Sequence, residues 1–188
     1  RQREAGYKPD VMIAPFSIHD EGCELFTQPQ VTGRMYNPGM MAARNIEVRF
    51  SDNMSSITGD INTALSDLNT GYSVSANPLK IEERTENGMS GYEIQGYRTL
   101  RVSCLFPGKT EGESFRIPSG FTFLASFLCK IAFQKANSSL KECLRKFVLT
   151  SRISFFDMSD RLHTKVQSLH LHDCMYDFKT GSFVMRFM

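Results

Sequence analysis

The sequence predicts an α+β domain built mostly of antiparallel sheet, with about two helices packed on it. Short segments in which apolar and polar residues alternate recur along the chain, and this is the pattern of half-buried strands. One later segment has helical spacing instead, and the C-terminal end contains two apolar runs separated by a turn. The chain has 188 residues, of which 41% are hydrophobic, so it can bury one core and we expect a single domain over 1–188.

The N-terminal half is expected to alternate strands, turns and one helix. Apolar runs within 11–28 flank a polar turn and predict a hairpin, whereas we expect mobile loops near 29–44 and 77–91, which lack a period. The segment NIEVRF at 45–50 alternates strictly and predicts a strand. An aspartate stands where a helix cap is expected, and the apolar residues after it predict a helix over about 60–69.

The C-terminal half contains the clearest patterns. The segment YRTLRVSCLF at 97–106 alternates and predicts a strand. The apolar run at 121–133 fits period two better than 3.6, which favours a strand, with a buried helix as the alternative. An S-x-x-E capping box at 139–142 begins an amphipathic helix, and SRISFF after it predicts a strand. The segment 169–188 predicts a hairpin whose turn uses Gly181.

The overall charge is too balanced to indicate a generic polyanion binder. Lys and Arg number 22 against 20 Asp and Glu, so an electrostatic site must be a local patch. An odd number of cysteines without a short repeated spacing favours a reducing compartment. The longest apolar run is shorter than a membrane-spanning helix, and no signal-peptide pattern follows the first residue. We therefore expect an intracellular protein that is neither secreted nor transmembrane.

The segment SLHLHDCMYDF raises the hypothesis of a metal site. In a regular strand His170, His172 and Cys174 lie on one face, and His163 is the other histidine nearby. Zinc requires a fourth ligand, and no C-x-x-C or H-x3-H pair accompanies these residues. We therefore expect the polar face of a hairpin strand, with no metal and no cofactor. The alternative is an enzyme or a metal- or ligand-binding domain with a dispersed site around these four residues.

Other catalytic patterns are incomplete. Gly108-Lys109-Thr110 follows a strand, as does the end of a phosphate-binding loop, but Ser103 stands where the first glycine of that loop is required. No G-x-S-x-G elbow or cysteine-protease signature is present. Cys104, Cys129 and Cys143 lie on apolar faces, which is typical of structural thiols. We expect no catalytic residue and no small-molecule substrate.

Two sets of residues are candidates for macromolecular contact. The polar face of the capped helix carries Lys141, Arg145 and Lys146, which core packing does not require, so we expect them to contact an anionic membrane or nucleic-acid phosphate. The residues expected to extend this face are Lys130, Lys135 and Arg152. Methionine suits adaptable protein contacts. The residues expected to mediate self-association are Met35, Tyr36, Met40 and Met41.

The order of the elements resembles that of rhabdovirus matrix proteins. The likeness rests on NIEVRF, the helix in GDINTALSDLN and the final hairpin MYDFKTGSFVMRF, without a PPxY-type budding motif. In that family a compact α+β domain follows a disordered basic arm, self-associates, condenses the nucleocapsid and lies beneath the envelope. The resemblance implies a non-enzymatic viral structural protein of the host cell and virion interior. Its implied partners are other copies of itself, the nucleocapsid or RNA phosphate, and an anionic membrane surface.

Overall fold

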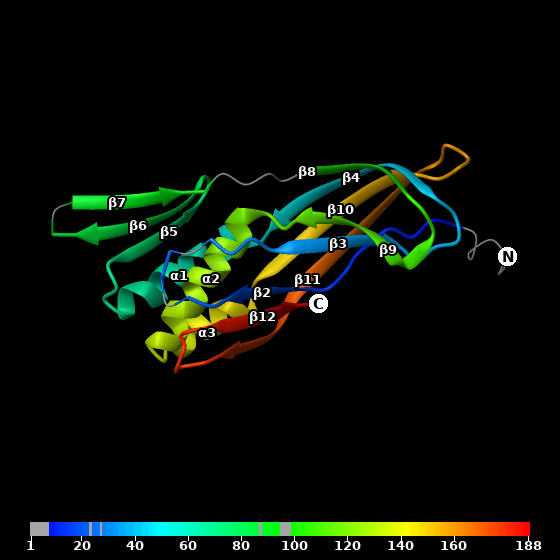
Figure 1. Ribbon diagram of the computed structural model, residues 1–188. Helices are drawn as coiled ribbons and strands as arrows, with labels where there is room; N and C mark the ends of the chain where they lie inside the picture. Colours follow the sequence, from blue (N-terminus) through cyan, green and yellow to red (C-terminus); the bar gives the residue numbers. More distant parts are fainter. Residues whose placement is uncertain (1–7, 23, 27, 87, 95–98) are drawn as a thin grey trace.

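The computed structural model describes residues 8–22, 24–26, 28–86, 88–94 and 99–188. Within these ranges the chain forms twelve strands and three helices, and the strands pair antiparallel, which confirms the α+β class with a majority of sheet. Figure 1 shows an elongated molecule in which a layered sheet region, a group of helices and a small outlying sheet follow one another.

The main sheet has six strands in the order β2-β12-β11-β10-β4-β8. These strands are β2 (Phe16–Asp20), β4 (Ala43–Asp52), β8 (Thr99–Leu105), β10 (Val148–Phe156), β11 (Leu162–Tyr176) and β12 (Phe183–Phe187). Successive side chains of a strand point to opposite faces. Accordingly Val48 and Ile153 are wholly buried, whereas Arg49 and Arg152 beside them are exposed. One face of the sheet forms the core, and the other meets solvent.

A second sheet covers the inner face of the main sheet and completes a β-sandwich. It contains β1 (Met12–Ile13), β3 (Thr32–Asn37) and β9 (Gly108–Arg116), in the order β1-β3-β9. The rings of Phe50 in β4 and Phe115 in β9 stack with centroids 5.6 Å apart. The side-chain amide of Gln167 accepts from Ile13 N–H at 2.9 Å and donates to Ile13 C=O at 2.8 Å. These contacts fix the short strand β1 on the main sheet.

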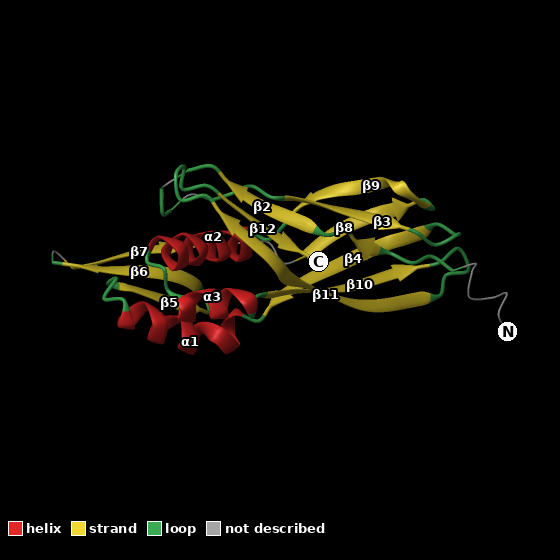
Figure 2. Cartoon of the chain, turned by 90° about the horizontal axis from the view of Figure 1, so that it is seen from below, coloured by secondary structure: helices red, strands yellow, loops and turns green. Residues whose placement is uncertain are grey.

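Three helices gather at one end of the sandwich, as Figure 2 shows. They are α1 (Met54–Asp67), α2 (Ser119–Gln134) and α3 (Ser138–Arg145). The Phe121 ring of α2 contacts the rings of Phe147 and Phe187, with centroids 5.8 and 5.2 Å away. Ala136, with a φ of 50°, turns the chain from α2 toward α3. Asn137 caps α3, because its side chain accepts a hydrogen bond from the Leu140 N–H at 2.7 Å.

The small sheet lies beyond the helices in Figure 1. It contains β5 (Tyr72–Ala76), β6 (Leu79–Thr85) and β7 (Gly88–Glu93), in that order. Phe26 stacks on Tyr92 of this sheet and on Phe127 of α2, with centroids 4.4 and 5.6 Å apart. Buried side chains from the three sheets and the three helices form one core, to which the small sheet contributes Val74, Leu79 and Ile81.

The preference for a strand at 121–133 is wrong, because these residues lie in the helix α2. Every residue from Phe121 to Ala132 is buried. A helix that is surrounded by protein needs apolar residues on all its faces, so its sequence loses the 3.6-residue period of a surface helix. Its alternating polar residues Thr122 and Ser126 are also buried, and each makes a hydrogen bond.

Several boundaries and loops also differ from the sequence expectations. The segment 29–44, expected to be a loop, contains β3, and 77–91 contains β6 and most of β7. The N-terminal hairpin is wrong, because β2 pairs with β12 and no strand forms in the described residues 24–26 and 28. Helix α1 begins at Met54 after Asn53, six residues before the expected cap at Asp60.

Other elements are confirmed. The segment NIEVRF lies in β4, residues 99–105 form β8, and SRISFF lies in β10. The amphipathic helix is confirmed as α3, but it begins at Ser138 and its cap is Asn137, so the capping box expected at 139–142 is wrong. Strands β11 and β12 form the terminal hairpin, and Gly181 has a φ of 72° in its turn, the conformation that glycine adopts without strain.

Candidate functional site

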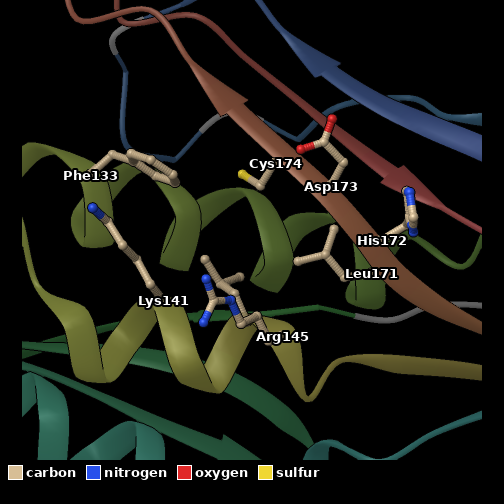
Figure 3. Close-up of a pocket in the computed structure, with 8 residues that line it drawn as sticks. Phe133, Lys141, Arg145, Leu171, His172, Asp173 and Cys174 are labelled. Atoms are coloured by element: carbon tan, nitrogen blue, oxygen red, sulfur yellow. The ribbon is translucent and has the colours of Figure 1, made fainter.

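A pocket of about 190 Å³ lies between α2, α3 and β11, as Figure 3 shows. The side chains that line it are Phe133, Lys141, Leu144, Arg145, Leu171, His172, Asp173 and Cys174. The pocket brings together two helix cations and two strand residues that sequence reasoning assigned to different hypotheses. Drug-sized ligands occupy roughly 300–1,000 Å³, so this pocket suits a ligand of only a few heavy atoms.

Helix α3 supplies the cationic side of the pocket. Lys141 and Arg145 are four residues apart and therefore face the same side of the helix, while the opposite side is buried through Leu144 and its neighbours. The Lys141 ammonium lies 4.5 Å from the centroid of the Phe133 ring, within cation–π range. Arg145 Nη1 lies 3.2 Å from Glu142 Oε2 in an exposed pair, and such pairs hold a side chain only weakly.

Two lysines expected in the same cationic face lie elsewhere. The Lys146 ammonium donates to Asp60 of α1 at 2.8 Å, and this hydrogen bond raises the pKa of Lys146. Lys130 is wholly buried, pairs with Asp20 at 2.8 Å and donates to the Glu24 carbonyl oxygen. The expectation that Lys130 extends an exposed face is wrong, because α2 has no solvent side at that position.

A β-bulge in β11 corrects the expectation that His170, His172 and Cys174 share one face. The register of β11 against β12 shifts by one residue at His172, so the alternation reverses there. His170 remains exposed, whereas Cys174 lies opposite the buried Met185 and faces α2. The bulge thus turns Cys174 toward α2 and away from the face that carries His170.

Cys174 of β11 lies against Cys129 of α2, and their sulfur atoms are 3.5 Å apart. Cys129 is wholly buried, while Cys174 is partly exposed and lines the pocket. The hydrogen bond from Cys129 lowers the pKa of the Cys174 thiol, and the Lys141 charge acts in the same direction. The same contact, together with burial, raises the pKa of Cys129. Cys174 is therefore the more acidic thiol of the pair.

His163 belongs to a different local structure. It lies near the opposite end of β11 from Cys174, where its Nε2 is 2.9 Å from Asp157 Oδ2 and its ring stacks on Phe155. The hydrogen bond from His163 and others from backbone N–H groups lower the pKa of Asp157 to about 2. The four residues of the dispersed-site alternative are therefore not brought together. Among the described residues, no group of three or more His, Cys, Asp or Glu side chains could hold a metal ion.

The outward face of the main sheet carries a cationic surface that sequence reasoning missed. Arg152 of β10 lies directly opposite Arg49 of β4, and Arg101 of β8 lies directly opposite Glu47 of β4. Val166 of β11, which is 63% exposed, lies directly opposite Arg152 on its other side. Hydroxyl residues occupy most of the other neighbouring outward positions: Ser51, Thr99, Thr150, Ser154, Thr164 and Ser168. We call Arg49, Arg101 and Arg152, with Glu47 and these hydroxyl residues, the arginine face.

The charges of the arginine face are only partly compensated. Glu47 accepts from Arg49 Nε at 2.7 Å and from Arg101 Nε at 3.1 Å, which lowers the pKa of Glu47. The side chains of Arg49 and Arg101 remain 70% and 81% exposed. Like charges directly opposite each other destabilise a sheet, so the Arg49–Arg152 pair costs stability in the isolated chain.

The residues expected to mediate self-association lie in different environments. Met35 is wholly buried in β3, so that part of the expectation is wrong: a core side chain presents no surface to a partner. Tyr36 and Met41 are half-buried, and Met40 is 64% exposed. Side chains of β3 alternate between the core and the surface, and the Met35 side chain points into the core.

Met40 is one of four exposed apolar side chains at the end of the sandwich opposite the helices. The connections β3–β4, β8–β9 and β10–β11 all lie at this end in Figure 1. Asn37 Nδ2 joins two of them by donating to the backbone oxygens of Met41 and Leu105, at 2.7 and 3.2 Å. These connections and the start of β11 expose four large apolar side chains, which we call the apolar tip: Met40, Phe106, Met158 and Leu162.

No helix among the described residues is both long and apolar enough to span a membrane. Comparisons of the chain with family models, with curated proteins and with solved structures find no match. The candidate functional surfaces of the chain are the arginine face, the apolar tip and the pocket.

Proposed function

We propose that the chain is a non-enzymatic structural protein that self-associates and binds nucleic-acid phosphates through the arginine face. The observation that carries this proposal is the direct opposition of Arg49 and Arg152 on an exposed sheet surface. The repulsion between them is relieved when an anion lies between the two guanidinium groups. A role of this kind agrees with the resemblance to rhabdovirus matrix proteins, which implies a viral protein that contacts a nucleocapsid.

The chemistry of the arginine face suits a phosphate backbone better than a lipid bilayer. Guanidinium groups bind phosphate oxygens through two parallel hydrogen bonds, and serine and threonine hydroxyls are common partners of phosphates in nucleic-acid complexes. Arg49 and Arg101 contact Glu47 through Nε, which leaves their terminal nitrogens for an external acceptor. Insertion into a bilayer relies on a continuous apolar face, whereas the surface around Arg152 consists mostly of hydroxyls.

The apolar tip supports the self-association part of the proposal. Met40 and Phe106 are 64% and 68% exposed, and Met158 and Leu162 are 54% and 61% exposed. Scattered apolar residues are ordinary on a protein surface, but a group at one end is typical of a protein contact. Each copy can thus use one end for contact with another copy while its sheet face remains open to an anionic polymer.

RNA binding across a salt series tests the proposal. The variant Arg49→Ala/Arg152→Ala should lower the dependence of log K on log salt by about two, because each contact to phosphate contributes about one unit. The matched control Arg84→Ala/Lys179→Ala removes two exposed cations outside the arginine face and should leave the slope unchanged. The proposal would be refuted if both variants reduced the salt dependence of RNA binding equally, or if the parent bound no RNA at low salt.

The same variants distinguish the other candidate partner. Vesicles containing an anionic lipid replace RNA in a co-sedimentation assay across the same salt range. If Arg49→Ala/Arg152→Ala loses vesicle binding and the parent binds no RNA, the face contacts a membrane and the proposal of a nucleic-acid partner is wrong. If Lys141→Ala/Arg145→Ala loses RNA binding instead, α3 carries the contact.

A further inference from the structure

The contact between Cys129 and Cys174 has the geometry of a dithiol pair. Their sulfur atoms are 3.5 Å apart and not bonded. A disulfide needs a separation of about 2.05 Å, so the two sulfurs must approach by about 1.5 Å, which two side chains can share. One sulfur belongs to a helix and the other to a strand far away in sequence, so the fold, and not local chain geometry, brings them together.

A small molecule in the pocket can reach the Cys174 thiol but not the Cys129 thiol. Cys174 lines the pocket, whose volume of about 190 Å³ admits a molecule of a few heavy atoms. Cys129 lies behind Cys174 and is wholly buried. Lys141, Arg145, His172 and Asp173 also line the pocket, and in Figure 3 the Asp173 carboxylate points away from Lys141 and Arg145. Positive charge near a thiol favours the thiolate, which is the nucleophilic form.

We propose that Cys174 and Cys129 form a redox-reactive site that a small hydroperoxide oxidises to an intramolecular disulfide. The Cys174 thiolate attacks one peroxide oxygen, the O–O bond breaks, and the leaving oxygen takes a proton from solvent to give water or an alcohol. Cys174 is then a sulfenic acid. The Cys129 thiol attacks the Cys174 sulfur, and the hydroxyl group leaves as water with the Cys129 proton. The two sulfurs together lose two electrons, which reduce the peroxide.

The disulfide links α2 to the part of β11 that follows the bulge. It also removes the Cys174 thiol from the pocket lining. This reaction is independent of the arginine face, which lies on the outward side of the main sheet.

Treatment of the whole purified chain with hydrogen peroxide tests the proposal. Alkylation of the remaining thiols and peptide mapping should show a Cys129–Cys174 crosslink, an intact mass lower by two hydrogen atoms, and reversal by dithiothreitol. In Cys129→Ser the reaction should stop at a Cys174 sulfenic acid that dimedone traps. In Cys174→Ser the Cys129 thiol should stay reduced. Cys143→Ser removes a buried thiol of α3 and is the matched control, with the crosslink retained.

Alkylation kinetics of the parent provide a measurement that does not depend on the folding of a variant. A limiting amount of iodoacetamide should modify Cys174 at least tenfold faster than Cys129. Three results would overturn the proposal: a parent whose Cys129 and Cys174 stay reduced while Cys104 is oxidised, Cys129 reacting first, or a Cys143→Ser variant that loses the crosslink while it remains folded.

Discussion

The buried ion pair between Lys130 and Asp20 allows a direct test of the packing around α2. The ammonium of Lys130 has no exposed surface, and the Asp20 side chain is only 6% exposed, with 2.8 Å between nitrogen and oxygen. Asp20 also accepts from the Ser126 hydroxyl at 3.1 Å and from the Gly22 N–H at 3.0 Å. Replacing Asp20 by alanine leaves a buried positive charge without its carboxylate, and such a loss costs about 3–5 kcal/mol.

Replacing Lys130 by methionine should lower the free energy of unfolding by a similar amount, but for a different reason. In Lys130→Met the side chain fills a similar volume, but the Asp20 carboxylate then lacks its cation in a buried site. We expect the free energy of unfolding of this single variant to be about 3–5 kcal/mol lower than that of the parent. The double variant Asp20→Ala/Lys130→Met has no buried charge at the site, so it should be destabilised by less than the sum of the two single changes.

Urea unfolding of the four proteins, followed by circular dichroism, measures the effect. The midpoint should fall in each single variant at unchanged slope, and the double variant should recover part of that fall. The expected loss corresponds to a decrease in melting temperature of roughly 6–20 °C for a chain of this size. Additive effects in the double variant, or a loss below about 1 kcal/mol in Asp20→Ala, would show that the pair is solvated and that α2 is not buried as described.

Three further outcomes are expected. Phe147→Ala should destabilise the chain by about 3–5 kcal/mol in urea unfolding, because the wholly buried ring packs on Phe121; an unchanged midpoint would contradict this packing. Ala136→Gly should stabilise it by up to about 1 kcal/mol in the same assay, because relief of about 1–2 kcal/mol of strain at a φ of 50° exceeds the roughly 0.4–1 kcal/mol of chain entropy that glycine costs, and a lower midpoint would disprove the strain. The pKa of Asp157 is lowered from 3.8 to about 2, so its contribution is present above pH 3.8 and is lost as pH falls toward 2. Urea midpoints across this range should therefore fall more steeply for the parent than for Asp157→Asn, and parallel curves would contradict the role of His163.

The strands and the amphipathic helix could be predicted because each buries one face only. In β4, β8 and β10 a single face is covered, so the sequence alternates as the side chains do. Helix α3 buries one stripe and therefore keeps its helical period. The sequence of helix α2 lacks a helical period because α2 is buried on all sides. The segments that form β3 and β6 were expected to be loops because they contain glycine, asparagine or charged residues.

The candidate site could be predicted only in part, because register and bulges depend on the fold. From the sequence, Arg152 is expected to extend the cationic face of the capped helix, whereas its direct opposition to Arg49 depends on a pairing between distant segments. The contact of Cys129 with Cys174 likewise depends on one extra residue at His172. In a regular strand without the bulge, the period-two rule places Cys174 on the exposed side with His170.

The bulge at His172 also determines how the chain tolerates insertions and deletions. Inserting or deleting one residue elsewhere in β11 reverses the faces of the residues beyond that point, so their inward side chains would lose contact with the core. At position 172 the strand already contains such an insertion, so deleting His172 should give a regular strand in which Leu171 and Asp173 keep their partners in β12 and the segments on both sides keep their faces. The segment before 172 forms part of the arginine face, and the segment after it forms part of the pocket. Position 172 is therefore a place in β11 where the loss of one residue leaves both surfaces on their present sides.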